Sequence, residues 1–502
     1  MADTQSRLDI DEILQLKGKL LQKDWRMLIG GELVKAEQGE TYETVNPANG
    51  EIIASVPFAQ ASDVNRAVET AKVAFESWRT VPPIERGRYI RRLAEEFTRR
   101  ANEFAVLDAV DSGNPVTAMR GDVFAAAAMM EYMSGLATEM KGETFPSSQH
   151  WHLTRREPYG VIGRIIPYNH PIMFTAAKIA GPLIAGNTVV LKAPDQCPLS
   201  ALLFGELCRE ILPPGTVNIV TGDGRTTGDA LVRHPDVKRI ALIGSVGTGQ
   251  TILKSSAEVG IKHISLELGG KNAMIVFPDV DIDKAAASAV RGMNFTWCQG
   301  QSCGSTSRLF VHEDIYDEFI PKLQYYVEQI KIGDPLDPNT EMGCLVSQNQ
   351  YNKVVSYIRS AHEDGARLLM GGSKAEGKTF ENGYFISPTV FENLTKHMRI
   401  FNEEIFGPVL SVIKWNDVDD AIQQINSVPY GLTGSIWSKD VTTALRAAEK
   451  IESGFVWING SSSHFLGVPY QGYKDSGIGS EEGLDEILSY TQVKTVNIML
   501  DN

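Results

Sequence analysis

An α/β fold built on parallel sheets is predicted by three features of this 502-residue sequence. The first is the alternation of short apolar segments with helix-length segments between residues 160 and 280. Strands are predicted at 188–192, 217–220, 240–243 and 264–268, with helices between them at about 198–212, 226–233 and 248–259. Such alternation is typical of βαβ units and therefore of a parallel sheet.

The second feature is a helical segment, and the third is another α/β region. Residues 60–140 are rich in alanine, arginine and glutamate and predict helices, the first beginning near Ala61. A second alternating region runs from about 271 to 470, with strands near 307–311 and 409–413. The segment 490–498 alternates as a terminal strand does. Because such a strand can pair with another chain, an oligomer is expected.

Composition and charge exclude several classes of protein. The length allows two or three domains, and 43% hydrophobic with 22% charged residues is typical of a soluble globular protein. The net charge of −14 argues against a nucleic-acid partner. No apolar run reaches the roughly 20 residues of a membrane span, so no membrane partner is expected.

The N-terminus and the cysteines indicate a compartment. Residues 1–24 mix acidic, basic and apolar residues and predict an amphipathic arm, without the apolar core of a signal peptide. The five cysteines are an odd number without framework spacing. Free thiols of this kind are typical of a reducing compartment, so a cytoplasmic location is expected. No metal site is predicted.

The most informative residue is Cys303, which stands in the segment Gly-Gln-Ser-Cys-Gly at 300–304. A lone cysteine is usually a buried small hydrophobe, as is expected of Cys298 and Cys344. Small neighbours leave the Cys303 thiol accessible, which favours a nucleophile. Glu267 ends an apolar strand before two glycines, either as a solvated strand end or as a functional carboxylate. A thiolate nucleophile and a separate carboxylate base can form and hydrolyse an acyl intermediate.

Other polar segments have both a functional and a structural interpretation. Asn169 lies in a loop fixed by two prolines, where its amide can donate to an oxyanion or cap the helix that starts near Pro171. The glycine-rich segments at 222–228 and 244–249 can receive a phosphate or simply turn the chain. Lys192 and Asp195 can bracket a ribose diol or form a solvated strand end.

Taken together and in this order, these segments resemble the NAD(P)-dependent aldehyde dehydrogenase superfamily from about residue 25 to the end. The segments 403–409, 429–433, 454–459 and 474–479 complete the resemblance. It implies a dinucleotide-binding domain (1–140 and 160–270), an α/β catalytic domain (271–473) and a β oligomerisation arm (141–159 and 474–502). A homodimer or homotetramer is implied.

The resemblance also implies a reaction and the residues that perform it. An aldehyde is oxidised to a carboxylic acid through a thiohemiacetal and a thioester on Cys303, with hydride transfer to NAD(P). Asn169 and the Cys303 backbone N–H form the oxyanion hole, Glu267 activates water, and Lys178 and Glu481 match a supporting proton relay.

The cofactor positions implied by the resemblance lie mostly after strands. They are Ile165, Ile166, Pro167, Tyr168, Lys192, Asp195, Gly224, Gly228, Leu242, Gly244, Ser245, Thr248, Leu268, Glu404 and Phe406. Lys192 and Asp195 are placed at the adenosine ribose, Ser245 faces the pyrophosphate, Glu404 holds the nicotinamide ribose and Phe406 lies against the ring.

Some residues depart from the family pattern. Asp195 stands where a glutamate is usual, so NADP stays open beside the preferred NAD, and Arg225 is a candidate for holding a 2′-phosphate. Ile243 replaces a threonine and Tyr168 a tryptophan, while Gln471 and Ser480 replace a glycine and an arginine. None of these is the nucleophile or the base.

The substrate pocket implied by the resemblance is wide and aromatic. Its positions are His170, Ala177, Trp297, Ser302, Ser462, His464, Phe465 and Tyr470. Ala177 stands where a large aromatic is common, and Trp297 can stack on an aromatic substrate, face an ammonium or be a plain wall. A bulky or aromatic aldehyde is preferred over an ω-aminoaldehyde or betaine aldehyde. Because none of these positions is an arginine, a substrate with a free carboxylate is not favoured.

Three rival functions stay open. A coenzyme-A-acylating dehydrogenase would share the thioester but generally lacks the base seen here as Glu267. A cysteine hydrolase would need a histidine partner for Cys303. A non-catalytic binding or structural protein on the same fold would not need Cys303, Glu267 and Asn169 together.

Overall fold

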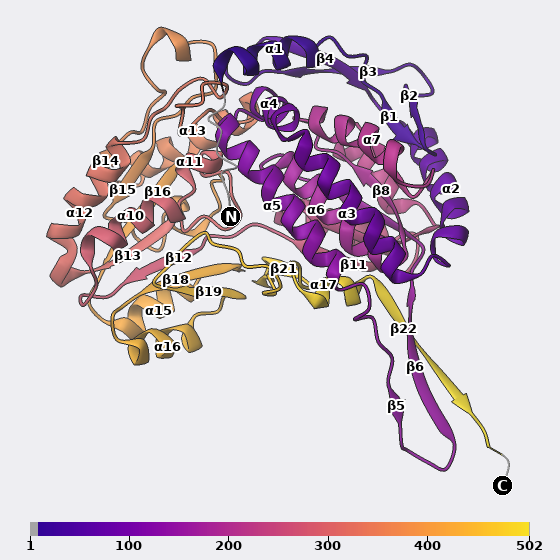
Figure 1. Cartoon of the computed structure of the whole chain (residues 1–502). Helices are drawn as coiled ribbons and strands as arrows, with labels where there is room; N and C mark the ends of the chain where they lie inside the picture. The colour runs from indigo at the N-terminus through magenta and orange to yellow at the C-terminus, as the bar shows by residue number, and fades with distance from the viewer. Residues whose placement is uncertain (1–8, 501–502) are drawn as a thin grey trace.

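Two sheets organise the chain in the computed structural model, which describes residues 9–500 (Figure 1). The amphipathic arm predicted over 1–24 is confirmed where it is described, because α1 (Ile10–Leu20) buries Ile13 and Leu20 and exposes its polar face. The predictions on residues 1–8 and 501–502 lie outside the described part. No helix between residues 9 and 500 is long and apolar enough to cross a membrane.

The first sheet has eight strands in the order β2-β1-β9-β8-β7-β10-β11-β21. Their bounds are β1 (Met27–Ile29), β2 (Glu32–Val34), β7 (Val161–Ile165), β8 (Thr188–Lys192), β9 (Val217–Val220), β10 (Val237–Ile243), β11 (His263–Glu267) and β21 (Gly477–Ile478). The five strands from β9 to β11 pair in parallel, as predicted. Since β7 leads outward to β8 and β9 before the chain returns to β10, the strand order reverses beside β7.

Helices cover this sheet and share one core cluster with it. They are α2 (Ala61–Trp78), α3 (Pro83–Arg99), α4 (Ala101–Ser112), α5 (Val116–Gly135), α6 (Pro171–Ile184), α7 (Leu199–Ile211), α8 (Asp229–Arg233) and α9 (Val246–Ala257). The helix predicted at 226–233 differs, because it begins as a π-helical turn, η1 (Gly224–Gly228), where Asp223 accepts from the Thr226 N–H. The helices predicted over 60–140 are confirmed.

The second sheet has seven strands in the order β14-β15-β16-β13-β12-β18-β19, all parallel except β14. Their bounds are β12 (Ala273–Val276), β13 (Arg308–His312), β14 (Arg367–Met370), β15 (Thr389–Glu392), β16 (Val409–Trp415), β18 (Thr433–Trp437) and β19 (Phe455–Ile458). Its helices are α10 (Ile282–Gly292), α11 (Phe295–Cys298), α12 (Glu313–Glu328), α13 (Gln348–Glu363), α14 (Arg399–Asn402), α15 (Val418–Asn426), α16 (Val441–Lys450) and the 3-10 turn η2 (Lys378–Phe380). Two buried clusters include residues of its strands and helices.

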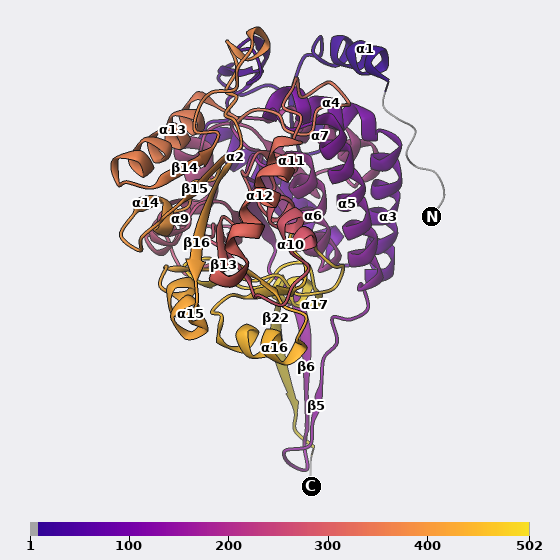
Figure 2. The same ribbon diagram turned by 90° about the vertical axis from the view of Figure 1, so that its left-hand side faces the viewer.

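A three-stranded arm projects from the molecule, as Figures 1 and 2 show. It consists of β22 (Thr491–Ile498), β6 (Trp151–Pro158) and β5 (Thr144–Phe145), in the order β22-β6-β5. The predicted terminal strand is confirmed, and it pairs with β6 of its own chain along its whole length. Two further ribbons and a short helix complete the chain: β3 (Thr41–Val45) with β4 (Ile52–Pro57), β17 (Tyr430–Gly431) with β20 (Tyr473–Lys474), and α17 (Leu484–Ser489). The domain boundaries stay a prediction.

The register of the first sheet gathers several predicted site residues at one edge. Ile165 lies opposite Lys192 on one side and Leu242 on the other, and Ile243 lies opposite Glu267. The carboxyl ends of these parallel strands are therefore level, which is where ligands bind in open α/β sheets.

Candidate active site

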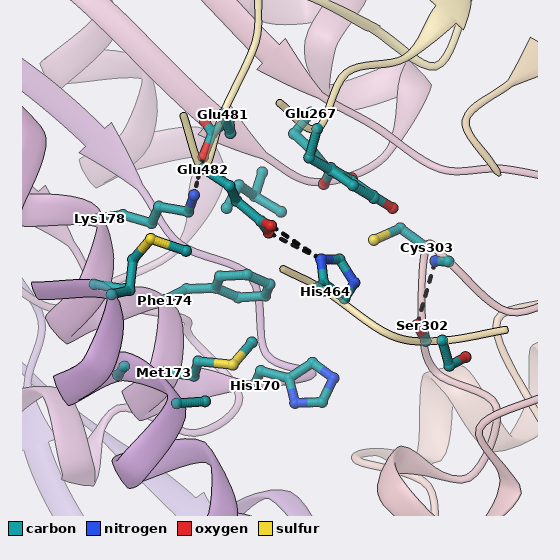
Figure 3. Close-up of a pocket in the computed structure, with 18 of the residues that line it drawn as sticks. His170, Met173, Phe174, Lys178, Glu267, Ser302, Cys303, His464, Glu481 and Glu482 are labelled. Carbon is teal, nitrogen blue, oxygen red and sulfur yellow. Dashed lines mark hydrogen bonds and ion pairs between the residues drawn. The ribbon is translucent and has the colours of Figure 1, made fainter. Parts of the chain in front are cut away.

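Cys303, Glu267 and Asn169 line one cavity of about 370 Å³. Figure 3 shows the Cys303 thiol pointing into this cavity, with Glu267 nearby and Lys178 beside Glu481. Glu267 ends β11 of the first sheet, whereas Cys303 lies between α11 and β13 of the second. The structure thus brings together residues that are far apart in the sequence.

The loop that carries Cys303 is fixed by its backbone. A Cβ atom on Gly300 would lie 2.4 Å from the Gly407 carbonyl oxygen, and its φ is +70°, so only glycine fits there. Asn272 donates from its side-chain amide to the Cys303 carbonyl at 2.6 Å, which anchors the loop from the other side. No pattern in the sequence indicates this role of Asn272.

Cys303 is the most accessible of the five cysteines. The other four are buried, which confirms the prediction that Cys298 and Cys344 are core residues. Burial within the cavity, together with the nearby Glu267 carboxylate, raises the pKa of the Cys303 thiol well above its usual range. The thiol is therefore neutral at rest and needs a proton acceptor before it can attack.

Glu267 has the properties of such an acceptor. Its side chain is buried, and neither carboxylate oxygen has a hydrogen-bond partner within residues 9–500. Burial raises the pKa of Glu267 to about 8. The interpretation as a solvated strand end is therefore wrong, because water does not surround this carboxyl group.

Asn169 does not cap helix α6. The N-cap position belongs to His170, and the Ile172 N–H donates instead to the Asp108 carboxylate at 3.0 Å. The Asn169 backbone oxygen accepts from the Asn114 amide at 2.9 Å, and its buried side-chain oxygen has no partner within the described chain. The Asn169 side chain is therefore available to a ligand in the cavity, which it lines.

Lys178 and Glu481 belong to a buried charge cluster. The Lys178 ammonium lies 2.6 Å from Glu481, which also accepts hydrogen bonds from both terminal nitrogens of Arg164 at 3.0 Å. Burial alone would raise the pKa of Glu481, but Arg164 and Lys178 lower it to about 2. Burial would lower the pKa of Lys178, but Glu481 and Glu486 raise it. This pair is held charged at the cavity wall.

All eight predicted pocket positions line the cavity: His170, Ala177, Trp297, Ser302, Ser462, His464, Phe465 and Tyr470. Further walls were missed, namely Ala125, Ala126, Ala128, Met129, Met173, Phe174, Trp457 and Leu466. Met173 and Phe174 lie three and four residues after His170, so helical spacing alone could have found them. The residues of α5 gave no such signal.

Asp122, which sequence reasoning also missed, organises the end of the pocket. Its carboxylate meets the His170 Nδ1 at 2.7 Å and accepts from the Trp297 indole N–H at 2.8 Å. The His170 and Trp297 rings pack edge to face at 4.7 Å. Burial would lower the pKa of His170, but the Asp122 charge raises it to about 10, so this imidazole is cationic. Asp122 stands in an alanine-rich helix without any motif.

The predicted cofactor residues follow the carboxyl ends of the first sheet or face them from the second. Ser245 caps α9 by accepting from the Thr248 N–H, and the buried Lys192 lies 3.7 Å from Asp195. Glu404 accepts from the Gly270 N–H at 2.9 Å. The remaining positions are Ile165 at the end of β7, Ile166, Pro167 and Tyr168 between β7 and α6, Gly224 and Gly228 in η1, Leu242 in β10, Gly244, Leu268 and Phe406.

These residues fit a dinucleotide. The N-terminus of α9 is open, because nothing lies within 4 Å of a Cβ built on Gly247. Such a helix start offers backbone N–H groups to a pyrophosphate. Tyr168 and Phe406 pack edge to face at 5.8 Å, beside the Glu404 carboxyl group.

Comparisons with known proteins agree on one family. The model of the "Aldehyde dehydrogenase family" matches residues 33–496. The aldehyde dehydrogenase tropH of Talaromyces stipitatus is 46% identical over 91% of this chain and 90% of its own. An indole-3-acetaldehyde dehydrogenase of P. syringae, solved with NAD+ and IAA, is 35% identical with a TM-score of 0.94, covering 97% and 99% of the two chains. A betaine aldehyde dehydrogenase of Staphylococcus aureus, solved with NAD+, is 34% identical with a TM-score of 0.94 and 97% coverage of both.

Proposed function

The chain belongs to the aldehyde dehydrogenase family and oxidises an aldehyde to a carboxylic acid; we propose that its substrate is a bulky or aromatic aldehyde and its hydride acceptor NAD. One observation carries the chemical part of this proposal. A neutral thiol, an unpartnered carboxyl group and a free side-chain amide meet on one cavity, at Cys303, Glu267 and Asn169.

The first half of the reaction forms the thioester. Cys303 gives its proton to the Glu267 carboxylate, and its sulfur attacks the carbonyl carbon. The carbonyl oxygen becomes an oxyanion, which the Asn169 amide and the Cys303 backbone N–H stabilise. Held by Lys192, Ser245 and Glu404, NAD would supply the acceptor for the hydride that leaves the former carbonyl carbon. The oxyanion then collapses to the thioester carbonyl.

The second half releases the acid. Glu267 first releases the thiol proton to solvent, which restores its carboxylate. It then accepts a proton from a water molecule that attacks the thioester carbon. The carbon–sulfur bond breaks, and the sulfur leaves as a thiolate. We assign Lys178 and Glu481 to the proton relay, because their ion pair reaches the same cavity.

The preference for NAD rests on Asp195. Its carboxylate lies near Lys192, at the place assigned to the adenosine ribose, where a 2′-phosphate would bring a second negative charge. Arg225 is exposed in η1 and is the alternative phosphate partner. Asp195→Ala is therefore expected to raise the use of NADP relative to NAD, whereas Arg225→Ala should leave NAD turnover unchanged.

The substrate class rests on the walls of the cavity. Small residues of α5 and Ala177 leave room for a ring, and the other walls are mostly Met129, Met173, Phe174 and Trp457. The indole-3-acetaldehyde dehydrogenase of P. syringae, solved with IAA, supports an aromatic side chain on the substrate.

The alternative is an ω-aminoaldehyde or betaine aldehyde, supported by the rings of Trp297, Trp457 and Phe465 and by a relative of that name. Asp122 argues against it, because its carboxylate is already engaged by the His170 imidazole and by the Trp297 indole N–H, and so offers no free charge to an ammonium group beside these rings.

We further propose a homodimer or homotetramer in the cytoplasm. The arm supports assembly, because Trp151, Val493, Ile498 and Leu500 are exposed there. Five free cysteines support a reducing compartment.

An aldehyde panel tests this function. Aromatic, aliphatic, ω-amino and betaine aldehydes are offered with NAD and with NADP, and reduced cofactor is followed. Aromatic aldehydes with NAD are expected to give the highest kcat/KM. Preference for the ammonium-bearing aldehydes would contradict the substrate class, and absence of turnover with every aldehyde would favour a non-catalytic protein or a coenzyme A requirement.

Two variants test the assigned chemistry. Cys303→Ala is expected to lower kcat by about 10³-fold or more while retaining NAD binding. Glu267→Gln is expected to accumulate a thioester and release acid slowly. Undiminished turnover in either variant would remove that residue from the mechanism.

A further inference from the structure

Tyr470 is held rigidly at the wall of the cavity. Its backbone N–H and C=O both pair with Glu481, at 2.9 and 2.8 Å, so it is tied to the buried charge cluster. Its side chain is 4% exposed and packs against Phe455 and His464, with ring centroids 5.3 and 4.9 Å away. These contacts fix where its hydroxyl group points.

The hydroxyl of this tyrosine has an unusual environment. It is buried and has no nitrogen or oxygen partner within residues 9–500. It lies 3.5 Å from the position of a Cβ built on Gly304, next to Cys303 in the sequence, and Cys303 packs against the same hydrophobic cluster as Tyr470. A buried O–H group without a partner is costly, so this orientation calls for an acceptor in the cavity.

The Cys303 sulfur is the group that lacks a donor. The carboxyl groups facing it are Glu267 from β11 and Glu404 from the loop after α14, and both disfavour negative charge on the sulfur. Once Cys303 has given up its proton, a buried anion therefore lies beside acidic groups. A hydrogen bond to such an anion is stronger than one between neutral groups.

We infer that Tyr470 is a further catalytic residue, whose hydroxyl group donates a hydrogen bond to the Cys303 thiolate and stabilises it for attack on the aldehyde. The tyrosine keeps its proton throughout; the thiol proton passes to Glu267, and the hydrogen bond lengthens as the sulfur forms its bond to carbon. The inference rests on the proposed role of Cys303 as the nucleophile.

The variant Tyr470→Phe tests this role, because it removes the hydroxyl and keeps the ring against Phe455 and His464. The measurement is the rate of Cys303 alkylation by iodoacetamide in the full-length enzyme, across the neutral to alkaline pH range, with the modified cysteine identified by mass spectrometry. Tyr316→Phe is the matched control, since that tyrosine is also buried but bonds Glu392.

The expected result is an alkylation profile displaced by about one pH unit toward higher pH in Tyr470→Phe, or about tenfold slower alkylation at neutral pH. The pre-steady-state rate of hydride transfer should fall by a similar factor, while KM and the unfolding midpoint stay near those of the wild type. Tyr316→Phe should match the wild type in alkylation and in hydride transfer.

An unchanged alkylation profile in Tyr470→Phe would overturn the inference. If KM alone rises while the profile is unchanged, Tyr470 lines the substrate pocket without acting on the thiolate. Because alkylation measures the reactivity of the Cys303 thiol directly, it tests the hydrogen bond from Tyr470 independently of aldehyde oxidation. Retained turnover in Cys303→Ala would instead overturn the proposed nucleophile.

Discussion

Glu267 shows how the burial of a single carboxyl group can set the pH range of this enzyme. A general base must be deprotonated, and burial raises the pKa of Glu267 to about 8. Release of the acid should therefore accelerate as the pH rises toward about 8 and level off above it. The measurement is kcat against pH, with single-turnover hydride formation followed in parallel.

Glu267→Gln is the control, because glutamine has the same shape and cannot titrate. Its slow turnover should lose the rising limb of the profile. If kcat of the wild type instead rises in the pH range where an exposed carboxyl group titrates, burial does not set the pKa of the base.

Residues differ in how far the sequence alone could place them. Cys303 and Glu267 stand in glycine-rich segments whose small neighbours leave room for chemistry, so both were predicted. Asp122 lies in a helix without a local motif, and the side chains that it bonds, His170 and Trp297, are 48 and 175 residues away in the sequence. Only tertiary structure could reveal that one carboxylate holds both walls.

At the scale of elements, α4 holds the starts of two other helices. The Asp108 carboxylate accepts from Ile172 in the first turn of α6, and Asp111 accepts from Leu199 in the first turn of α7. The two acids are three residues apart, hence on one face of α4. Since Asn169 directly precedes α6, this contact also steadies the cavity.

Removing the acceptor from α4 should therefore affect both stability and rate. Asp108→Ala is expected to lower the free energy of unfolding by about 1–3 kcal/mol, because the Ile172 N–H loses its partner, and to lower kcat. Chemical denaturation and steady-state kinetics would measure the two effects.

The matched control is Asp108→Asn, which keeps the acceptor oxygen. Burial raises the pKa of Asp108 to about 8, so the acid is largely protonated at neutral pH and asparagine resembles it. Asn should thus stay close to the wild type. A loss as large as that of Ala would show that the charge matters rather than the hydrogen bond.

Elements with strong local signals were predicted closely, and those shaped by contacts were not. The strands at 188–192 and 217–220 agree with the structure to the residue, because both are short apolar runs between turns. Helix α9 starts two residues earlier than predicted, where Ser245 provides the cap. The α5 residues that line the cavity could not be predicted, because they reach it only through the packing of α5 against α6.

At the scale of the whole molecule, the site depends on the placement of two sheets. Glu267 and Asn169 come from the first sheet and its loops, whereas Cys303, Trp457 and Phe465 come from the second. The alternation of strands and helices in the sequence predicted each parallel sheet, because parallel strands need crossover connections that are usually helical. The contact between them follows from long-range packing, which local patterns do not encode.

The arm carries the edge strand on which the proposed assembly would depend. β22 lies at the edge of a three-stranded sheet, pairs only with β6 within the described residues, and exposes apolar side chains on both faces. Val493 is 57% exposed and Ile498 41% exposed, on opposite faces of the strand. An edge strand of eight residues with this surface invites pairing with a second copy.

Charges on this strand should therefore separate the subunits. Sedimentation of the wild type is expected to give two or four times the mass of one chain, and Val493→Glu with Ile498→Glu the mass of one. Val73→Glu, at a 76% exposed position on α2, is the control and should keep the wild-type mass. A monomeric wild type would contradict assembly, whereas a double variant that stays oligomeric would place the interface elsewhere on the molecule.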